Sequence, residues 1–247
     1  EITTRLVGSE MCIRDRVRRA ISMALSRAEI CKTVGDDYEA STQFIAKYML
    51  SNLGTGKKFS DESGEMVTED IAKAKSLLAE AGYPNGAGFP TVTYNYPNNE
   101  QDKLIAQAIQ AQLKSALNIN VELNGMESQV CVSERKSGNF DMTRHNWTAD
   151  YDDAMDYLLM WTSTSGLNDA GIKDADYDKL CEDATAELDE TKRNTIMHDA
   201  EKLLVTDKAY VAPLATNKTI CLLNRKYTGY SFDSSGQILL KFIKAAE

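Results

Sequence analysis

The chain has 247 residues, of which 43% are apolar and 26% charged, and its formal net charge is −9 at pH 7. This composition is typical of a globular protein with one large or two small hydrophobic cores. The acidic balance, with no cluster of Lys and Arg, argues against nucleic acid or an anionic lipid surface as a partner. No apolar run approaches the roughly 20 residues that a membrane-spanning helix needs.

Residues 1–16 are expected not to be native sequence. The run Glu10–Arg16 back-translates to the transposon end used in sequencing-library adapters, and Arg5–Ser9 fits the adapter bases that precede it. We therefore interpret residues 1–16 as a translated adapter and exclude them from fold prediction. The alternative is a natural N-terminal tail. The segment contains three basic and three acidic residues, so the net charge of the remainder stays at −9.

The first half of the remaining chain predicts alternating helices and strands. Apolar spacing predicts a helix over Val17–Val34, and residues 35–66 are expected to form loops with short turns. Thr68 is a plausible N-cap for a helix that ends at Gly82, and Asn98 or Asn99 caps a longer helix to about Leu117. The other predicted elements are strands over Thr91–Tyr96, Ile119–Leu123 and Phe140–Trp147 and a short helix near Glu127–Lys136.

The second half begins with helices and ends with short β-like runs. The predicted helices lie around Ala154–Trp161, Tyr177–Leu188 and Lys192–Leu204. The β-like runs are Tyr210–Leu214, Thr219–Leu223 and Ile238–Ile243. Alternation of helix and strand predicts an α/β fold with mostly parallel strand pairing.

Four cysteines follow Val17, and their spacing indicates no metal site. Cys31, Cys131, Cys181 and Cys221 are far apart and form no CxxC pair. We interpret them as small buried apolar side chains. Free thiols are unusual in an oxidising exported setting, and the sequence leaves a disulfide open.

The sequence contains no pattern typical of a catalytic or metal centre. With only His145 and His198 there is no HExxH motif, and no GxSxG, phosphate loop or GxGxxG occurs. A run of aspartates could suggest calcium but lacks the Gly and closing Glu of a calcium loop, so we interpret it as helix capping and solvated charge; it comprises Asp150, Asp152, Asp153 and Asp156. The aspartates at 174, 176 and 178 have the same interpretation. We expect no cofactor, no metal and no enzymatic activity.

Five segments occur in the order found in one family of bacterial receptors. They are Val17–Leu25, Ala74–Tyr83 (a KxLLxEAGY-like helix and turn), Asn139–Met142, Arg144–Tyr151 and Ala209–Leu214. Together they resemble the extracellular solute-binding proteins, family 5, of the oligopeptide and dipeptide importers driven by ATP. The resemblance covers nearly all of the chain from Val17 to Ile243 and corresponds to the C-terminal part of such a protein.

The resemblance implies a periplasmic-binding-protein-like fold (type II, cluster C) that lacks its N-terminal part. Residues 17–208 would form the second ligand-binding lobe, and residues 209–247 would return to a first lobe outside this sequence. Tail strands without that lobe would have exposed edges. The implied function is peptide capture by closure of two lobes and delivery to permease subunits of an ABC importer. The implied setting is extracytoplasmic, as a monomeric periplasmic protein or lipoprotein attached only through an N-terminal anchor.

The resemblance also implies three ligand contacts at intervals of three residues. Asp150 would hold the free amino group of a peptide, because a carboxylate matches an ammonium in charge and donor geometry. Trp147 would offer a flat apolar wall, and Arg144 would pair with an acidic ligand group or order the cleft. Each has a structural alternative: a helix N-cap for Asp150, core packing for Trp147 and a surface salt bridge for Arg144. His145 is not a contact of the family, and we expect a solvated or packing histidine.

The sequence departs from the family just after Ala209–Leu214, the return crossing, where the chain would pass back to the first lobe. Peptide receptors often carry aromatic residues there, whereas this chain has Ala215-Thr216-Asn217-Lys218. The less aromatic wall keeps other ligands of the same fold open, namely nickel complexes, haem or oligosaccharides. A non-transport peptide sensor is a further alternative, and a hydrolase with paired carboxylates is a remote one.

Overall fold

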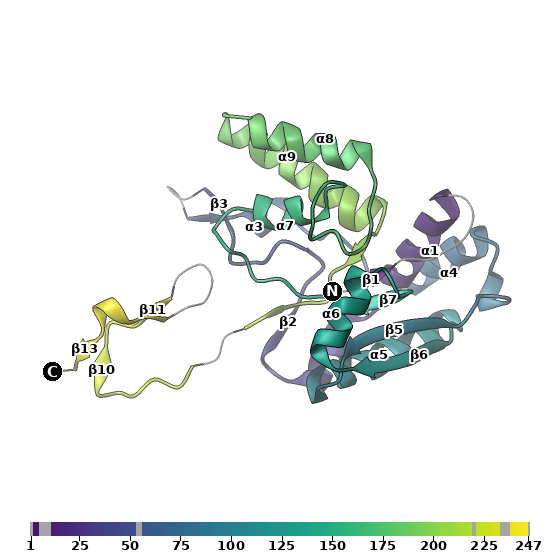
Figure 1. Ribbon diagram of the computed structural model, residues 1–247, viewed down its shortest axis with the longest axis horizontal. Helices are drawn as coiled ribbons and strands as arrows, with labels where there is room; N and C mark the ends of the chain where they lie inside the picture. Colours follow the sequence, from purple (N-terminus) through teal and green to yellow (C-terminus); the bar gives the residue numbers. More distant parts are fainter. Residues whose placement is uncertain (1, 5–10, 53–55, 219–220, 233–237, 247) are drawn as a thin grey trace.

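A computed structural model describes residues 2–4, 11–52, 56–218, 221–232 and 238–246. Its main sheet has five strands in the order β6-β5-β7-β1-β8 (Figure 1). The strands are β1 (Ile2–Thr4), β5 (Val92–Pro97), β6 (Val121–Met126), β7 (Met142–Arg144) and β8 (Val211–Ala212). Strand β5 pairs in parallel with β6 and β7, which confirms the predicted pairing, whereas β1 is antiparallel to β7 and β8.

Strand β1 lies within residues 1–16, the segment interpreted as a translated adapter. It lies between β7 and β8 and pairs with both. The first helix also begins inside that segment, at Met11. The predicted strand over Phe140–Trp147 is shorter than expected, because only Met142–Arg144 pairs in the sheet.

Helices pack on this sheet to form the first hydrophobic core. They are α1 (Met11–Met23), α2 (Arg27–Val34), α4 (Ile71–Glu80), α5 (Glu100–Leu117) and α6 (Ser128–Lys136). The apolar side chains of α1, α4 and α5 join those of β5 and β6, including Ile21, Leu78, Tyr94, Ile109 and Val121. Asn99 caps α5 as predicted, because its side chain accepts from the Asp102 amide. The predicted N-cap at Thr68 is wrong: Asp70 caps α4 and accepts from the Lys73 amide.

The predicted single helix over Val17–Val34 is two helices. The break falls between Met23 and Arg27, and the Arg27 side chain explains why it is stable. Its guanidinium donates to the carbonyl oxygens of Ser22 and Leu25 at 3.3 and 3.1 Å. These donations satisfy carbonyls that the end of α1 leaves without helical partners.

A second core lies under the helices of the C-terminal half. It contains α7 (Met155–Leu158), the 3-10 turn η2 (Leu159–Trp161), α8 (Ala175–Ala186) and α9 (Glu190–Lys202), the last followed by a π turn, η3 (Leu203–Asp207). Helices α8 and α9 lie side by side at the top of Figure 1. Residues 35–66 supply the short elements β2 (Tyr38–Ala40), β3 (Leu50–Asn52), β4 (Lys57–Lys58) and α3 (Phe59–Ser63). Phe44, Ile45, Met49 and Phe59 from this region are buried in the second core.

The end of the chain runs away from both cores. Strand β9 (Ala215–Asn217) pairs with β2, and the following chain extends to the far left of Figure 1. There it forms two strand pairs and a 3-10 turn: β10 (Tyr227–Thr228) with β13 (Lys244–Ala245), β11 (Ser231–Phe232) with β12 (Ile238–Leu239), and η4 (Leu240–Phe242). Apolar side chains of this tail are exposed, among them Leu222, Leu240 and Phe242.

Two predictions for this tail need correction. Residues 219–220 of the predicted run Thr219–Leu223 lie outside the described residues, and 221–223 form no strand. In Ile238–Ile243 only the first two residues are a strand, because the chain then turns through η4. Within the part of the chain that the structure describes, no helix is both long and apolar enough to cross a membrane.

Candidate ligand-binding cleft

A cavity of about 710 Å³ adjoins the segment Arg144–Tyr151, which was predicted to contact a ligand. This volume is within the range of small-molecule sites, roughly 300–1,000 Å³. Its walls are the segment Arg144–Thr148, the loop around Phe44–Tyr48, strand β2 and the residues Ala215–Lys218. Asp152, Tyr157 and Phe232 complete its lining together with Leu50 and Lys58. The cavity therefore unites parts of the chain that are up to almost 200 residues apart.

Arg144 is at the end of β7 and reaches this cavity. The residue is buried, and its Nε lies 3.0 Å from Oδ1 of Asp102 on α5. A guanidinium N–H also donates to the His145 carbonyl oxygen. Arg144 thus forms a salt bridge, as its structural alternative had it, but this salt bridge is largely buried and not at the surface.

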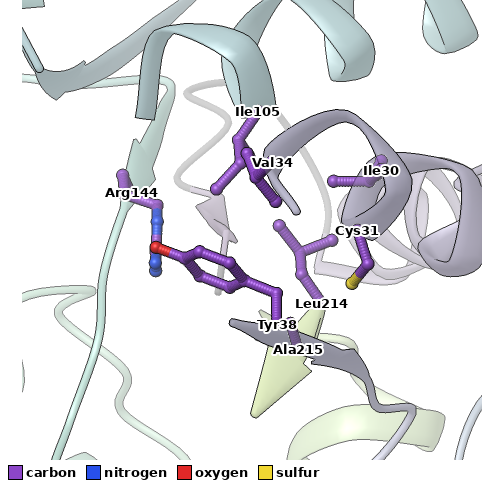
Figure 2. Close-up of a pocket in the computed structure, with 8 residues that line it drawn as sticks. All are labelled: Ile30, Cys31, Val34, Tyr38, Ile105, Arg144, Leu214 and Ala215. Carbon is purple, nitrogen blue, oxygen red and sulfur yellow. The ribbon is translucent and has the colours of Figure 1, made fainter. Parts of the chain in front are cut away.

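Arg144 also borders a second, much smaller cavity (Figure 2). Figure 2 shows the Tyr38 hydroxyl directed toward the guanidinium, with Cys31 and Leu214 on the other side. This cavity has about 10 Å³, which is about the space that one water molecule needs. It has no room for a peptide, so the larger cavity is the candidate site.

Trp147 is half-buried and lines the large cavity. It also packs against the second core, so its position is compatible both with contact to a ligand and with the packing alternative. Its indole Nε1 donates to Oδ2 of Asp156 at 2.7 Å. Asp156 is itself buried, and the same oxygen accepts the Asp150 amide at 3.2 Å.

Asp150 is exposed, and the large cavity ends short of it. The alternative of a helix N-cap is wrong, because α7 begins at Met155 and its N-cap position is Ala154. The structure thus brings Arg144 and Trp147 together in the cavity wall and leaves Asp150 beyond its edge.

The four aspartates of this segment have different surroundings. Oδ1 of Asp152 accepts the Leu50 amide at 3.3 Å, and Asp153 forms an ion pair with Arg193 at 2.9 Å. Asp156 holds Trp147, as described above. Among the described residues, no hydrogen bond or ion pair engages the Asp150 carboxylate. Asp150 is thus the carboxylate of this run without a hydrogen bond or ion pair among the described residues, whereas Asp152 accepts one amide hydrogen bond and lines the cavity.

His145 is a packing residue and not a solvated one, which were the two expectations for it. It is 4% exposed, and its ring centroid lies 5.5 Å from that of Trp161. Burial lowers the pKa of the imidazole from 6.5 to about 3, so the ring is neutral at pH 7.

A buried carboxylate supports the opposite wall of the cavity. Glu201 on α9 accepts the amide hydrogens of Phe44 and Ile45 through Oε1, at 2.8 and 3.0 Å. Phe44 lines the cavity, as do Ala46 and Tyr48 in the same loop. The hydroxyls of Tyr48 and Tyr157 lie 2.9 Å apart and join this loop to α7.

Three charged residues lie together in the cavity lining, namely Glu39 of β2, Lys47 of the following loop and Lys218, which follows β9. The Glu39 carboxylate is 2.7 Å from Nζ of Lys47 and 3.7 Å from Nζ of Lys218. The hydrogen bond from Lys47 lowers the pKa of Glu39, so this carboxyl group is ionised at neutral pH. Two ammonium groups against one carboxylate leave this wall with excess positive charge in a chain whose net charge is −9.

Several lining residues were not identified from the sequence. Residues 35–66 gave weak signals and were expected to be loops, yet they supply Glu39, Phe44, Lys47 and Tyr48. A periodic pattern could not reveal them, since β2, which contains Glu39, has only three residues and the other three lie in a loop. The return segment Ala215–Lys218 was expected to form a less aromatic wall, and all four of its residues line the cavity.

The sequence and the fold resemble those of known receptors. The family model of bacterial extracellular solute-binding proteins, family 5 (middle), matches residues 10–169. The dipeptide-binding protein DppE of Bacillus subtilis is 30% identical over 238 residues, which are 96% of this chain and 43% of that protein. The probable deoxycholate-binding periplasmic protein YgiS of Escherichia coli is 32% identical over 216 residues, 87% of this chain and 39% of that protein.

Solved structures agree with the sequence comparisons. The crystal structure of a periplasmic oligopeptide-binding protein from Borrelia burgdorferi superposes with a TM-score of 0.78 and 26% identity, over 99% of this chain and 48% of that one. The chain thus spans less than half the length of these relatives, which are binding proteins and not enzymes. The chain belongs to family 5 of the bacterial extracellular solute-binding proteins.

Proposed function

We propose that this chain is part of the substrate-binding component of an ABC importer that captures peptides. The observation that carries the proposal is the cavity of about 710 Å³ whose wall includes Arg144–Thr148, which belong to the predicted ligand segment Arg144–Tyr151. Binding would proceed by closure of the first lobe over the cavity, without covalent chemistry. Permease subunits of the importer would be the protein partner, and the setting would be extracytoplasmic, with a monomeric receptor held at most by an N-terminal lipid anchor.

Three residues are proposed as ligand contacts. Asp150 would bind the peptide α-ammonium, since its carboxylate is exposed and has no hydrogen-bond or ion-pair partner among the described residues. Closure over Asp150 would remove water from such a pair and strengthen it. Trp147 would contact a ligand side chain, and Arg144 would attract a ligand carboxylate.

A titration followed by NMR tests the proposal on the 247-residue chain. The chain has two tryptophans, and Trp161 is completely buried whereas Trp147 lines the cavity. Addition of trialanine should move the indole ¹H–¹⁵N signal of Trp147 and leave that of Trp161 in place. Weak binding, in the millimolar range, is expected for an open site, and NMR detects it. If the Trp147 signal does not move at a trialanine concentration 10-fold above that millimolar range, the proposal is contradicted.

A receptor for a different ligand is the second candidate. The observation that favours it is the wall of Ala215, Thr216 and Asn217, which presents no aromatic surface to a peptide. Deoxycholate and a short oligosaccharide therefore serve as parallel titrants. A response to either of them without a response to trialanine would favour this candidate over peptide binding.

A further inference from the structure

The carboxylate of Asp156 lies behind the ligand segment and holds two of its residues. Asp156 is 8% exposed and belongs to α7. One oxygen, Oδ2, accepts the indole N–H of Trp147 at 2.7 Å and the main-chain N–H of Asp150 at 3.2 Å. Hydrogen bonds to an ionised acceptor are shorter and stronger than those between neutral groups. A single buried atom thus fixes the indole and the backbone of the proposed ammonium-binding residue.

The bond to Asp156 also determines what Trp147 can offer to a ligand. An indole has one polar hydrogen, on Nε1, and no acceptor of comparable strength. Because Asp156 accepts that hydrogen, the rest of the indole presents only carbon atoms and its π face. Such a surface favours apolar or aromatic side chains over those that need a hydrogen-bond donor.

We infer that Asp156 is a positioning residue that makes Trp147 an apolar subsite of the cavity. The positioning stands on the two hydrogen bonds, whereas the specificity rests on the proposed peptide function. Asp152 and Asp153 cannot replace Asp156, because their carboxylates bind Leu50 of β3 and Arg193 of α9. Asp156 therefore has a role that the other aspartates of the run do not share.

The indole signals test the positioning without any ligand. In D156A the Trp147 signal should move to the position of an indole without a strong acceptor, and the Trp161 signal should stay. D156N keeps an oxygen acceptor, so its Trp147 signal should remain near that of the original chain. The matched control is D183A, an exposed aspartate of α8 that pairs with Lys179, and it should move neither signal. A Trp147 signal that is the same in D156A and in the original chain would overturn the inference.

A second measurement keeps the test decisive if D156A does not fold. Hydrogen exchange of the Trp147 indole proton in the unaltered chain should be slowed by at least tenfold relative to a free indole, because the bond must open first. Exchange at the rate of a free indole would overturn the inference. This result is independent of any property of the variants.

Peptide titrations test the specificity. Trileucine and triasparagine have side chains of similar shape and place the same side chain in every subsite. The original chain should bind trileucine more tightly, and D156A, which frees the indole N–H, should reduce that preference by roughly three- to tenfold, as expected for one hydrogen bond. An unchanged preference in folded D156A would overturn the specificity. If no peptide moves the Trp147 signal, the proposed function and the specificity fail together, while the ligand-free spectra still decide the positioning.

Discussion

Oε1 of Glu201 lies 2.8 Å from the amide nitrogen of Phe44, so a carboxylate on α9 fixes a cavity wall 157 residues away. The other oxygen, Oε2, is buried and accepts no hydrogen bond within the described residues. Burial raises the pKa of Glu201 from 4.5 to about 7, although the two amide donors oppose this rise. The contact therefore has an electrostatic cost that depends on pH.

Glu201→Gln should remove a pH dependence of stability. A folded-state pKa of about 7 against about 4.5 in the unfolded chain means that the folded state binds the proton more tightly. The stabilisation from this protonated carboxyl group is fully present below pH 4.5 and is lost as pH rises toward 7. The loss amounts to roughly 3 kcal/mol in the free energy of unfolding. Gln keeps an oxygen acceptor and cannot ionise, so the variant should not lose this stabilisation between pH 4.5 and 7.

Urea unfolding at pH 5 and pH 8 checks this prediction. The comparison must be between variants, because His145, whose pKa is lowered to about 3, acts in the opposite direction between pH 3 and 6.5. The control is Glu182→Gln at an exposed site of α8, which should behave like the original chain. The same pH dependence in the original chain and in Glu201→Gln would show that this carboxylate does not titrate near neutrality.

Arg27→Met should destabilise the chain by about 3 kcal/mol or more. The guanidinium is 1% exposed and donates to the Pro213 carbonyl at 2.8 Å as well as to Ser22 and Leu25, so it joins the α1–α2 break to the return crossing. Methionine fills similar space but leaves these carbonyls without donors.

Lysine at position 27 should not restore this stability, because one ammonium cannot reproduce the planar fork of the guanidinium. The control is Arg225→Met in the exposed tail, with an expected change within about 0.5 kcal/mol. Chemical denaturation measures all three variants. Full stability in Arg27→Lys would mean that charge alone, and not the geometry of the donors, matters here.

Two glycines of one turn should respond differently to alanine. Gly86 and Gly88 both have positive φ, +73° and +75°, so an alanine is strained by about 1 kcal/mol or more at either position. At Gly86 the added Cβ would also lie 2.5 Å from the Leu117 carbonyl oxygen, whereas at Gly88 nothing lies within 4 Å. Thermal unfolding should show a loss for Gly86→Ala that exceeds that for Gly88→Ala by about 2 kcal/mol. Equal losses would indicate that the chain after α5 moves aside without cost.

Local chemistry made much of the fold predictable. The cap at Asn99 and the apolar face of α5, with Ile105, Ile109 and Leu113, need only the sequence near them. The helix near Glu127–Lys136 was placed within one residue of its observed start. The break near Arg27 was missed because it is stabilised by hydrogen bonds of the buried guanidinium to the carbonyls of Ser22, Leu25 and Pro213, which apolar periodicity does not reveal.

The cavity was predictable only in part, for a related reason. Arg144 and Trp147 were found through the resemblance of one segment to a family. Asp156 was interpreted as capping or solvated charge, because its bond to Trp147 spans nine residues of irregular chain. Glu201 gave no signal, since its partners at Phe44 and Ile45 come from the other end of the chain.

The central claim is that the Asp150 carboxylate binds a peptide ammonium, and a two-by-two affinity comparison tests it most directly. Trialanine and N-acetyl-trialanine would be titrated into the original chain and into Asp150→Asn, with Asp183→Asn as control. The account predicts that the original chain binds the free peptide about tenfold more tightly, and that Asp150→Asn abolishes this preference without weakening the acetylated peptide. Equal binding of both peptides by the original chain, or an undiminished preference in Asp150→Asn, would contradict it.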